Sequence, residues 1–194
     1  HSPQQTVDAQ VRPLAYWPDG SLRWLLVDAG LPLATGATPL QVTINGDKTA
    51  ASSTVLNWYE DADTITARSS HLQVTLVKTG HGLPLCVERS SGELLLDLGN
   101  QAADPLRCVL GNGYQLQPGV IHAPTIEEAG PLRTVLSWQT PWLDARGVAH
   151  LCSTFRLHIY ADQPFVKLVH RLLVTSPALG AAATGQSRPT AEQY

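Results

Sequence analysis

The chain has 194 residues, with 13 Lys and Arg against 16 Asp and Glu and a formal net charge of −3. This small acidic surplus excludes the basic stripe that grips nucleic acid, and the 43% of hydrophobic residues excludes a disordered chain. No apolar run approaches the roughly 20 residues of a membrane-spanning helix. We therefore expect no nucleic-acid partner and no membrane partner.

Strand patterns follow one another along most of the sequence, because short apolar or alternating runs are bounded by turn residues. No helical period of useful length interrupts them. In chain order, the expected strands are Leu22–Asp28, Leu40–Ile44, Leu72–Lys78, Pro84–Glu88, Glu93–Leu98, Leu132–Trp138, Ala149–Tyr160 and Phe165–Thr175. Together with 15 Gly and 14 Pro, this spacing predicts an all-β fold, either a barrel or a sandwich.

A polar stretch at Thr49–Asp63 separates two differently patterned parts of the chain. We expect residues 1–60 to form part of a small barrel-like β domain and residues 61–178 to form a β-sandwich. Residues 179–194 are rich in Ala, Gly, Thr and Ser, which is typical of a linker or a frayed end. The chain begins with His1 and contains no Met, so we expect a part of a longer protein or a processed one.

The cysteines are Cys86, Cys108 and Cys152, and they form no CxxC pair. Their odd number argues against a zinc knuckle or a disulfide framework. They are most simply interpreted as small buried hydrophobic residues, although one pair could form a bridge and leave one thiol over.

Residues 10–28, QVRPLAYWPDGSLRWLLVD, form the densest pattern in the chain. Pro18-Asp19-Gly20 predicts a tight turn, because Gly accepts a positive φ and Asp bonds its own backbone. Apolar and aromatic residues flank this turn on both sides. From these residues alone, the segment is a hairpin whose tryptophans, Trp17 and Trp24, fill a core.

This segment resembles the N-terminal barrel-like domain of exo-acting rhamnogalacturonan lyase-like proteins, whose approximate pattern is Q-x-R-x-L-A-x-W-P-D-G-S-x-R-W-x-L-x-D. The residues that fit are Gln10, Arg12, Leu14, Ala15, Trp17, Pro18, Asp19, Gly20, Ser21, Arg23, Trp24, Leu26 and Asp28. Less sharply, Gly130–Val135 and Phe155–His170 are similar to the central β-sandwich of the same proteins.

The resemblance implies a partial barrel-like domain followed by a mutarotase-like antiparallel β-sandwich. It further implies a secreted or periplasmic protein that cleaves uronate-containing glycans of the pectin or rhamnogalacturonan type by β-elimination. Family members carry a helical toroid after the sandwich. The toroid would then be a partner within the same chain, and the present residues alone would not be fully active.

Cleavage by β-elimination needs a cation for the sugar carboxylate, a base for the C5 proton and an acid for the leaving oxygen. Residues alternate between the two faces of a strand, so Ala149–Tyr160 predicts one apolar face and one polar face. If the next strand pairs through the turn at Asp162, cations of both strands could gather on the polar side. The predicted catalytic residues are His122, His158 and Tyr160, and the predicted substrate-binding residues are Arg133, Arg156, Lys167 and Arg171.

The alternatives to this site stay open. An exposed sheet face often carries Arg, Lys and His for solubility and edge protection. We expect His122 in a loop, Gly119–Pro131, beside Glu127 and Glu128, where it could be an ordinary surface residue. Its spacing to these acids matches no metal motif, so no metal site is predicted, and a need for Ca²⁺ is left unknown.

Two other functions are considered. Paired carboxylates of a glycosidase, such as Asp61 and Asp63, are disfavoured because spacing alone does not place them across a sugar ring. A non-catalytic module that binds carbohydrate or serves as a structural sandwich is the stronger alternative. Its candidate sugar-stacking aromatics are Trp58, Tyr59, Trp138 and Trp142.

Overall fold

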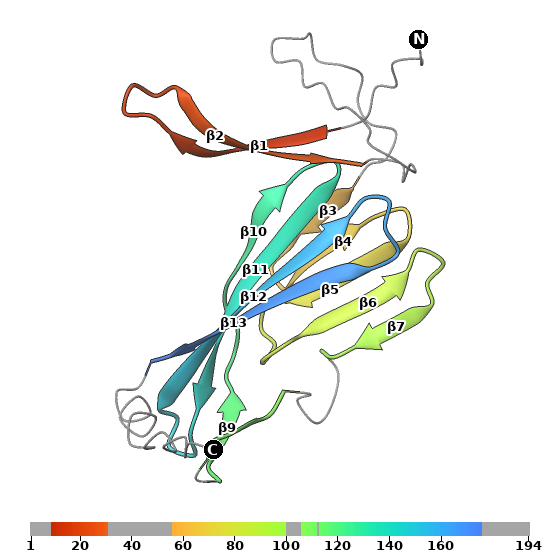
Figure 1. Ribbon diagram of the computed structural model, residues 1–194. Coiled ribbons are helices and arrows are strands. Elements are labelled where there is room, and N and C mark those ends of the chain that lie inside the picture. Colours follow the sequence, from red (N-terminus) through yellow and green to blue (C-terminus); the bar gives the residue numbers. More distant parts are fainter. Residues whose placement is uncertain (1–8, 31–55, 100–105, 112, 176–194) are drawn as a thin grey trace, which may run out of the picture.

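The computed structural model describes residues 9–30, 56–99, 106–111 and 113–175. Within these ranges every regular element is a β-strand (Figure 1), which confirms the predicted all-β class. The strands are β1 Ala9–Tyr16, β2 Leu22–Ala29, β3 Asn57–Glu60, β4 Thr64–Arg68, β5 Leu72–Val77, β6 Leu85–Arg89, β7 Leu94–Asp97, β8 Cys108–Val109, β9 Gln115–Pro118, β10 His122–Ala129, β11 Arg133–Leu143, β12 Ala149–Tyr160 and β13 Val166–Val174.

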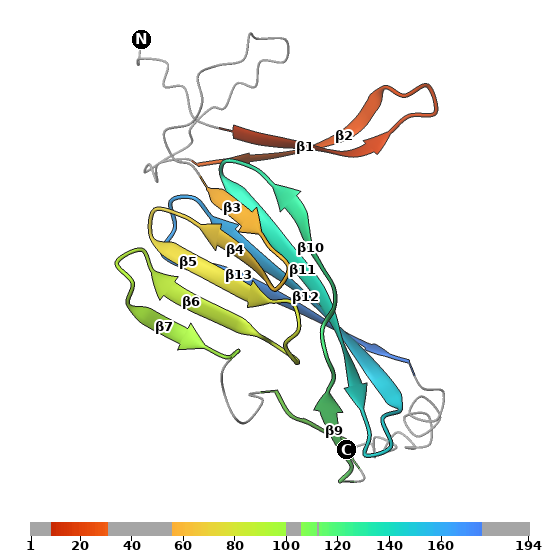
Figure 2. The same cartoon turned by 180° about the vertical axis from the view of Figure 1, so that it is seen from behind.

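The strands form three antiparallel groups. Strands β1 and β2 make a hairpin, and β3-β4-β5-β6-β7 form a five-stranded sheet. A six-stranded sheet has the order β13-β12-β11-β9-β8, with β10 also paired to β11. The two larger sheets lie face to face as a sandwich, and the hairpin lies across one end of it (Figure 2). Within the described residues no helix occurs that could cross a membrane.

Alternation along the strands builds the core between the two sheets. In β5 every second residue is buried, and in β12 the buried residues run from Leu151 to Ile159 in the same rhythm. The Trp138 and Phe155 rings stack with their centroids 5.3 Å apart, and both side chains are almost fully buried. The apolar face predicted for β12 is therefore confirmed as the core face.

Most expected strands are found with their ends shifted by one or two residues, and Ala149–Tyr160 is found with its expected bounds. Leu40–Ile44 and the tail 179–194 lie outside the described residues. Strand β3, which the sequence pattern did not indicate, ends at the predicted boundary and pairs with β4 in the five-stranded sheet. The division of the chain at residue 60 stays a prediction.

The expected loop at Gly119–Pro131 is wrong over most of its length, because β10 occupies His122–Ala129. Its pairing with β11 shifts register twice, once after His122 and once at Glu127. Such bulges break the alternation by which a strand is recognised in a sequence, and they explain why the pattern was missed.

Strand β11 continues through Pro141, beyond its expected end at Trp138. Proline lacks the N–H that a ladder needs. The carbonyl of Pro141 accepts a hydrogen bond from the Gly119 amide, on the side where the neighbour of β11 changes from β10 to β9. Since the ladder is interrupted at that point, the missing N–H costs little.

Candidate functional site

The predicted site residues lie on the face of the six-stranded sheet that points away from the core. Residues opposite each other in antiparallel strands share one face, so the register places them in rows. The pairs are Arg133–Tyr160, His158–Lys167 and Thr154–Arg171. We call this surface of β10, β11, β12 and β13 the outer face.

His122 lies at the far end of the outer face. It pairs with Gln139, which pairs with Thr154, four residues along β12 from His158. At the rise of a β-strand, four residues correspond to about 13 Å. The structure therefore does not bring His122 to the bond on which His158 and Tyr160 would act.

The surroundings of His158 favour the neutral form of its imidazole. Burial lowers the pKa of its imidazole below the ordinary 6.5, and the nearby charges of Arg133 and Lys167 lower the pKa further. Its Nδ1 is buried and has no hydrogen-bond partner among the described residues. A neutral imidazole can accept a proton, which is what a general base requires.

Arg156 is engaged by a carboxylate from β10. Its Nε donates to Glu127 Oε2 at 2.6 Å, and its Nη2 donates to Glu127 Oε1 at 3.1 Å. The pKa of Glu127 is lowered, chiefly by this hydrogen bond with Arg156. Because Glu127 occupies the guanidinium fork, a sugar carboxylate would have to displace it.

Arg133 is engaged more completely. Its Nη2 donates to both carboxylate oxygens of Glu128, at 2.8 and 3.1 Å, and lies 3.0 Å from Asp28 Oδ2. Its side chain is only 13% exposed. Arg133 therefore links the hairpin, through Asp28, to Glu128 of the sandwich. Its role in substrate binding stays a prediction.

Lys167 and Arg171 differ from these two arginines. Both are exposed on β13, and neither forms an ion pair within the part of the chain that the structure describes. Lys167 stands beside His158 in the register. Tyr160, the neighbour of His158 on the same face, has its ring 5.7 Å from that of Phe165.

The polar residues of the hairpin motif hold the hairpin to the sandwich. The Gln10 amide donates to Glu128 Oε1 at 2.6 Å, and its Oε1 accepts the amides of Leu132 and Arg133 at 3.1 and 2.9 Å. Arg12 Nε lies 3.6 Å from Glu128 Oε2. We call Gln10, Arg12, Asp28, Glu128 and Arg133 the hairpin clasp.

The turn of the motif forms as predicted, but its aromatic residues do not fill a core. The Asp19 carboxylate accepts the Ser21 amide at 2.9 Å, and Gly20 has a φ of 83°. Trp17 and Trp24 are 49% and 61% exposed, and the Arg23 guanidinium lies over the Trp17 ring at 4.5 Å. Sequence reasoning missed the clasp because its partners lie more than 100 residues away.

The aromatics proposed for sugar stacking divide into two pairs. Trp58 and Tyr59 on β3 are 44% and 45% exposed, so they stay available. Trp138 and Trp142 are buried and donate through Nε1, to the Gly82 carbonyl at 3.2 Å and to Ser153 Oγ at 2.8 Å. Their proposed contact with a sugar is wrong, because both belong to the core.

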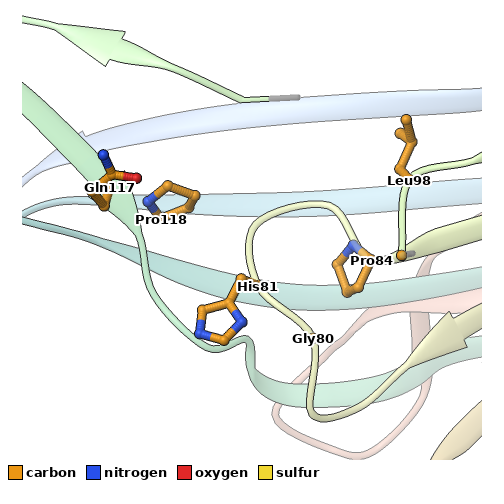
Figure 3. A pocket seen from close by; sticks show the side chains of 7 residues that line it. Gly80, His81, Pro84, Leu98, Gln117 and Pro118 are labelled. Carbon is orange, nitrogen blue, oxygen red and sulfur yellow. The ribbon is translucent and has the colours of Figure 1, made fainter. Parts of the chain in front are cut away.

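A hollow of about 290 Å³ lies away from the outer face, where the loop that begins at Gly80 meets β9. Figure 3 shows His81 and Pro84 on the loop, with Gln117 and Pro118 on the facing strand. One imidazole and one amide provide no catalytic set. Within the described ranges, no three His, Cys, Asp or Glu side chains gather in a way that could hold a metal ion.

Residues 1–37 match the family model described as the PcRGLX-like N-terminal RIFT barrel domain. No curated protein matches the chain. The match covers the hairpin motif and stops before the sandwich. Residues 1–37 are thus similar to a RIFT barrel domain of the rhamnogalacturonan lyase-like kind, as the motif predicted.

Proposed function

We propose that the chain is the N-terminal β portion of a secreted polysaccharide lyase-like protein, and that its outer face binds uronate-containing glycans. The observation that carries the proposal is the position of Lys167, an exposed cation without an ion pair, beside the neutral His158. Arg171 adds a second such cation two rows along the same strand. A cationic sheet face next to an unprotonated imidazole suits an acidic sugar chain.

The reaction would be a β-elimination. Lys167 neutralises the sugar carboxylate, which acidifies the C5 proton. His158 accepts that proton, the released electron pair forms the C4–C5 double bond, and the C4–oxygen bond breaks. Tyr160, two residues along the same face at about 7 Å, is the candidate that protonates the leaving oxygen. The helical toroid expected in the family would complete the cleft.

Turnover is tested by incubating the chain, alone and as part of the full-length protein, with rhamnogalacturonan and polygalacturonate. The measurement is the ultraviolet absorbance of the unsaturated product. We expect product from the full-length protein and little from the present chain. Absence of product from the full-length protein on every uronate polymer contradicts the lyase proposal.

Binding is tested separately with a fluorescent oligogalacturonate and anisotropy. The variant Lys167→Gln/Arg171→Gln should weaken binding about tenfold, since each lost charge-assisted contact is worth roughly 1.5–3 kcal/mol and screening reduces that. The matched control is Arg68→Gln/Arg89→Gln, which removes two exposed cations from the five-stranded sheet. Equal loss in both variants would show only a general charge effect.

A non-catalytic carbohydrate-binding module is the second candidate. It is favoured by the engagement of Arg133 and Arg156 with Glu128 and Glu127, which leaves fewer cations for catalysis. Binding to the outer face without product from the full-length protein supports this function over the lyase.

A further inference from the structure

A second hollow, of about 280 Å³, is lined by residues around β9 and in the turn between β11 and β12. Strand β9 and this turn lie at the end of the six-stranded sheet opposite the β1–β2 hairpin (Figure 1). The segment around β8 and β9 supplies one wall, and the turn between β11 and β12 supplies the other. The residues that matter are Leu110, Tyr114, Leu116, Asp144, Arg146 and His150. None of them belongs to the outer-face site described above.

Asp144 organises the β11–β12 turn. Its Oδ1 accepts the amides of Arg146 at 2.8 Å and Val148 at 2.9 Å, and its Oδ2 lies 3.0 Å from His150 Nε2. Gly147 takes the positive φ of 79° that the turn requires. The hydrogen bond with His150 is the largest cause that lowers the pKa of Asp144 to about 2, so this carboxylate stays ionised.

The same contacts orient His150. Its Nδ1 is buried and has no hydrogen-bond partner among the described residues, and its Nε2 donates to the ionised Asp144 carboxylate. The Asp144 carboxylate holds the His150 imidazole in one orientation in the absence of a ligand. A side chain that is already ordered loses less conformational entropy when a ligand binds. The charge of Asp144 is at the same time compensated by its three donors.

Arg146 supplies the uncompensated charge of the hollow. It is exposed at the tip of the turn and forms no ion pair with any residue that the structure describes. Tyr114 is 57% exposed, and Leu116 below it is 3% exposed. An aromatic ring with an apolar floor suits the carbon–hydrogen face of a sugar, and a guanidinium fork suits a carboxylate.

We infer that this hollow is a second binding site, which takes a hydroxylated carboxylate the size of one sugar ring. Arg146 binds the carboxylate, the Tyr114 ring packs against the ring face, and the His150–Asp144 pair contacts a hydroxyl group. The volume lies at the lower limit of small-molecule sites, which fits one ring and not a chain. The site extends the proposed function, because it takes the same ligand class at a separate place.

The experiment is isothermal titration calorimetry of the whole chain with three probes. Galacturonate carries both the carboxylate and the hydroxyl groups, galactose lacks the carboxylate, and cyclohexanecarboxylate lacks the hydroxyl groups. We expect galacturonate to bind at least about tenfold more tightly than either, because each partial probe loses one set of polar contacts. Equal affinity for all three, or no heat with galacturonate at millimolar concentration, overturns the inference.

Variants assign the binding to the hollow. Arg146→Gln and Tyr114→Ser should each weaken galacturonate binding about tenfold, and both residues are exposed, so the fold should persist. Arg89→Gln, an exposed arginine of the five-stranded sheet, is the matched control and should leave the affinity unchanged. If Lys167→Gln/Arg171→Gln abolishes galacturonate binding and Arg146→Gln does not, the hollow is not a site and the outer-face proposal stands. The reverse result assigns monosaccharide binding to the hollow, and the outer face is then judged by the oligogalacturonate assay alone.

Discussion

At the scale of single residues, Gln10 explains the position of the whole hairpin. Its amide bonds the Glu128 carboxylate and two backbone amides of the sandwich, and it is 8% exposed. Gly130 lies so close that a Cβ there would overlap the side-chain amide of Gln10. The clasp therefore leaves no room for a side chain at position 130 while Gln10 keeps its position.

Gly130→Ala should destabilise the chain by about 1–3 kcal/mol, because the added methyl group forces the Gln10 side chain out of its position. Urea unfolding checks this value. In the double variant Gln10→Ala/Gly130→Ala the clash is gone, so the two effects should be clearly less than additive. Gly111→Ala is the control, since a Cβ at Gly111 meets nothing within 4 Å. Simple additivity contradicts the described contact.

His158 makes the stability of the fold depend on pH. Its pKa is lowered in the folded state, so the unfolded chain binds more protons between the folded value and about 6.5. Stability is therefore full above the unfolded pKa and falls as the pH drops toward the folded pKa. The pKa values of Glu127 and Asp144 are lowered from 4.5 and 3.8, so their effects belong to a more acidic range.

Thermal unfolding of the wild type should accordingly show a lower Tm at pH 5.5 than at pH 7.5. In His158→Gln this decrease should be smaller, because the side chain no longer takes up a proton on unfolding. An identical decrease in both proteins would mean that His158 is not held neutral by its surroundings.

At the scale of elements, β12 is the strand best predicted from sequence. One face packs on the core and the other does not, so its alternation is complete over the whole length. Strand β10 was not predicted, because bulges break its pattern. Glu127 lies at the second of these bulges, where its carboxylate accepts hydrogen bonds from Arg156. The alternation of residues along the strands predicts that the cations share one face. The carboxylates that bind these cations come from another strand, and no local sequence pattern indicates that contact.

Strand β13 is an edge strand, and its side chains contribute less to the stability of the fold than the buried side chains of β12. Leu172 is 49% exposed, whereas Leu157 on β12 is 1% exposed. Leu172→Ala should change the free energy of unfolding by about 0.5 kcal/mol or less, and Leu157→Ala should cost about 2–5 kcal/mol. Urea unfolding compares the two. A large cost at Leu172 would show that β13 is covered in solution.

At the scale of the whole molecule, a two-layer sandwich carries a clasped hairpin at one end and a polar hollow at the other, with the outer face between them. The clasp uses Arg133, and the charge of Arg133 helps to keep His158 neutral. The position of the hairpin is thereby coupled to the electrostatics of the outer face.

The most direct test of glycan binding at the outer face is to map amide chemical shifts while the isotope-labelled chain is titrated with oligogalacturonate. We expect the chemical-shift changes to gather on β12 and β13 around His158, Lys167 and Arg171, and to become smaller in Lys167→Gln/Arg171→Gln. Shifts confined to the five-stranded sheet, or no shifts at all on the outer face, would contradict the assignment of that face as the glycan-binding surface.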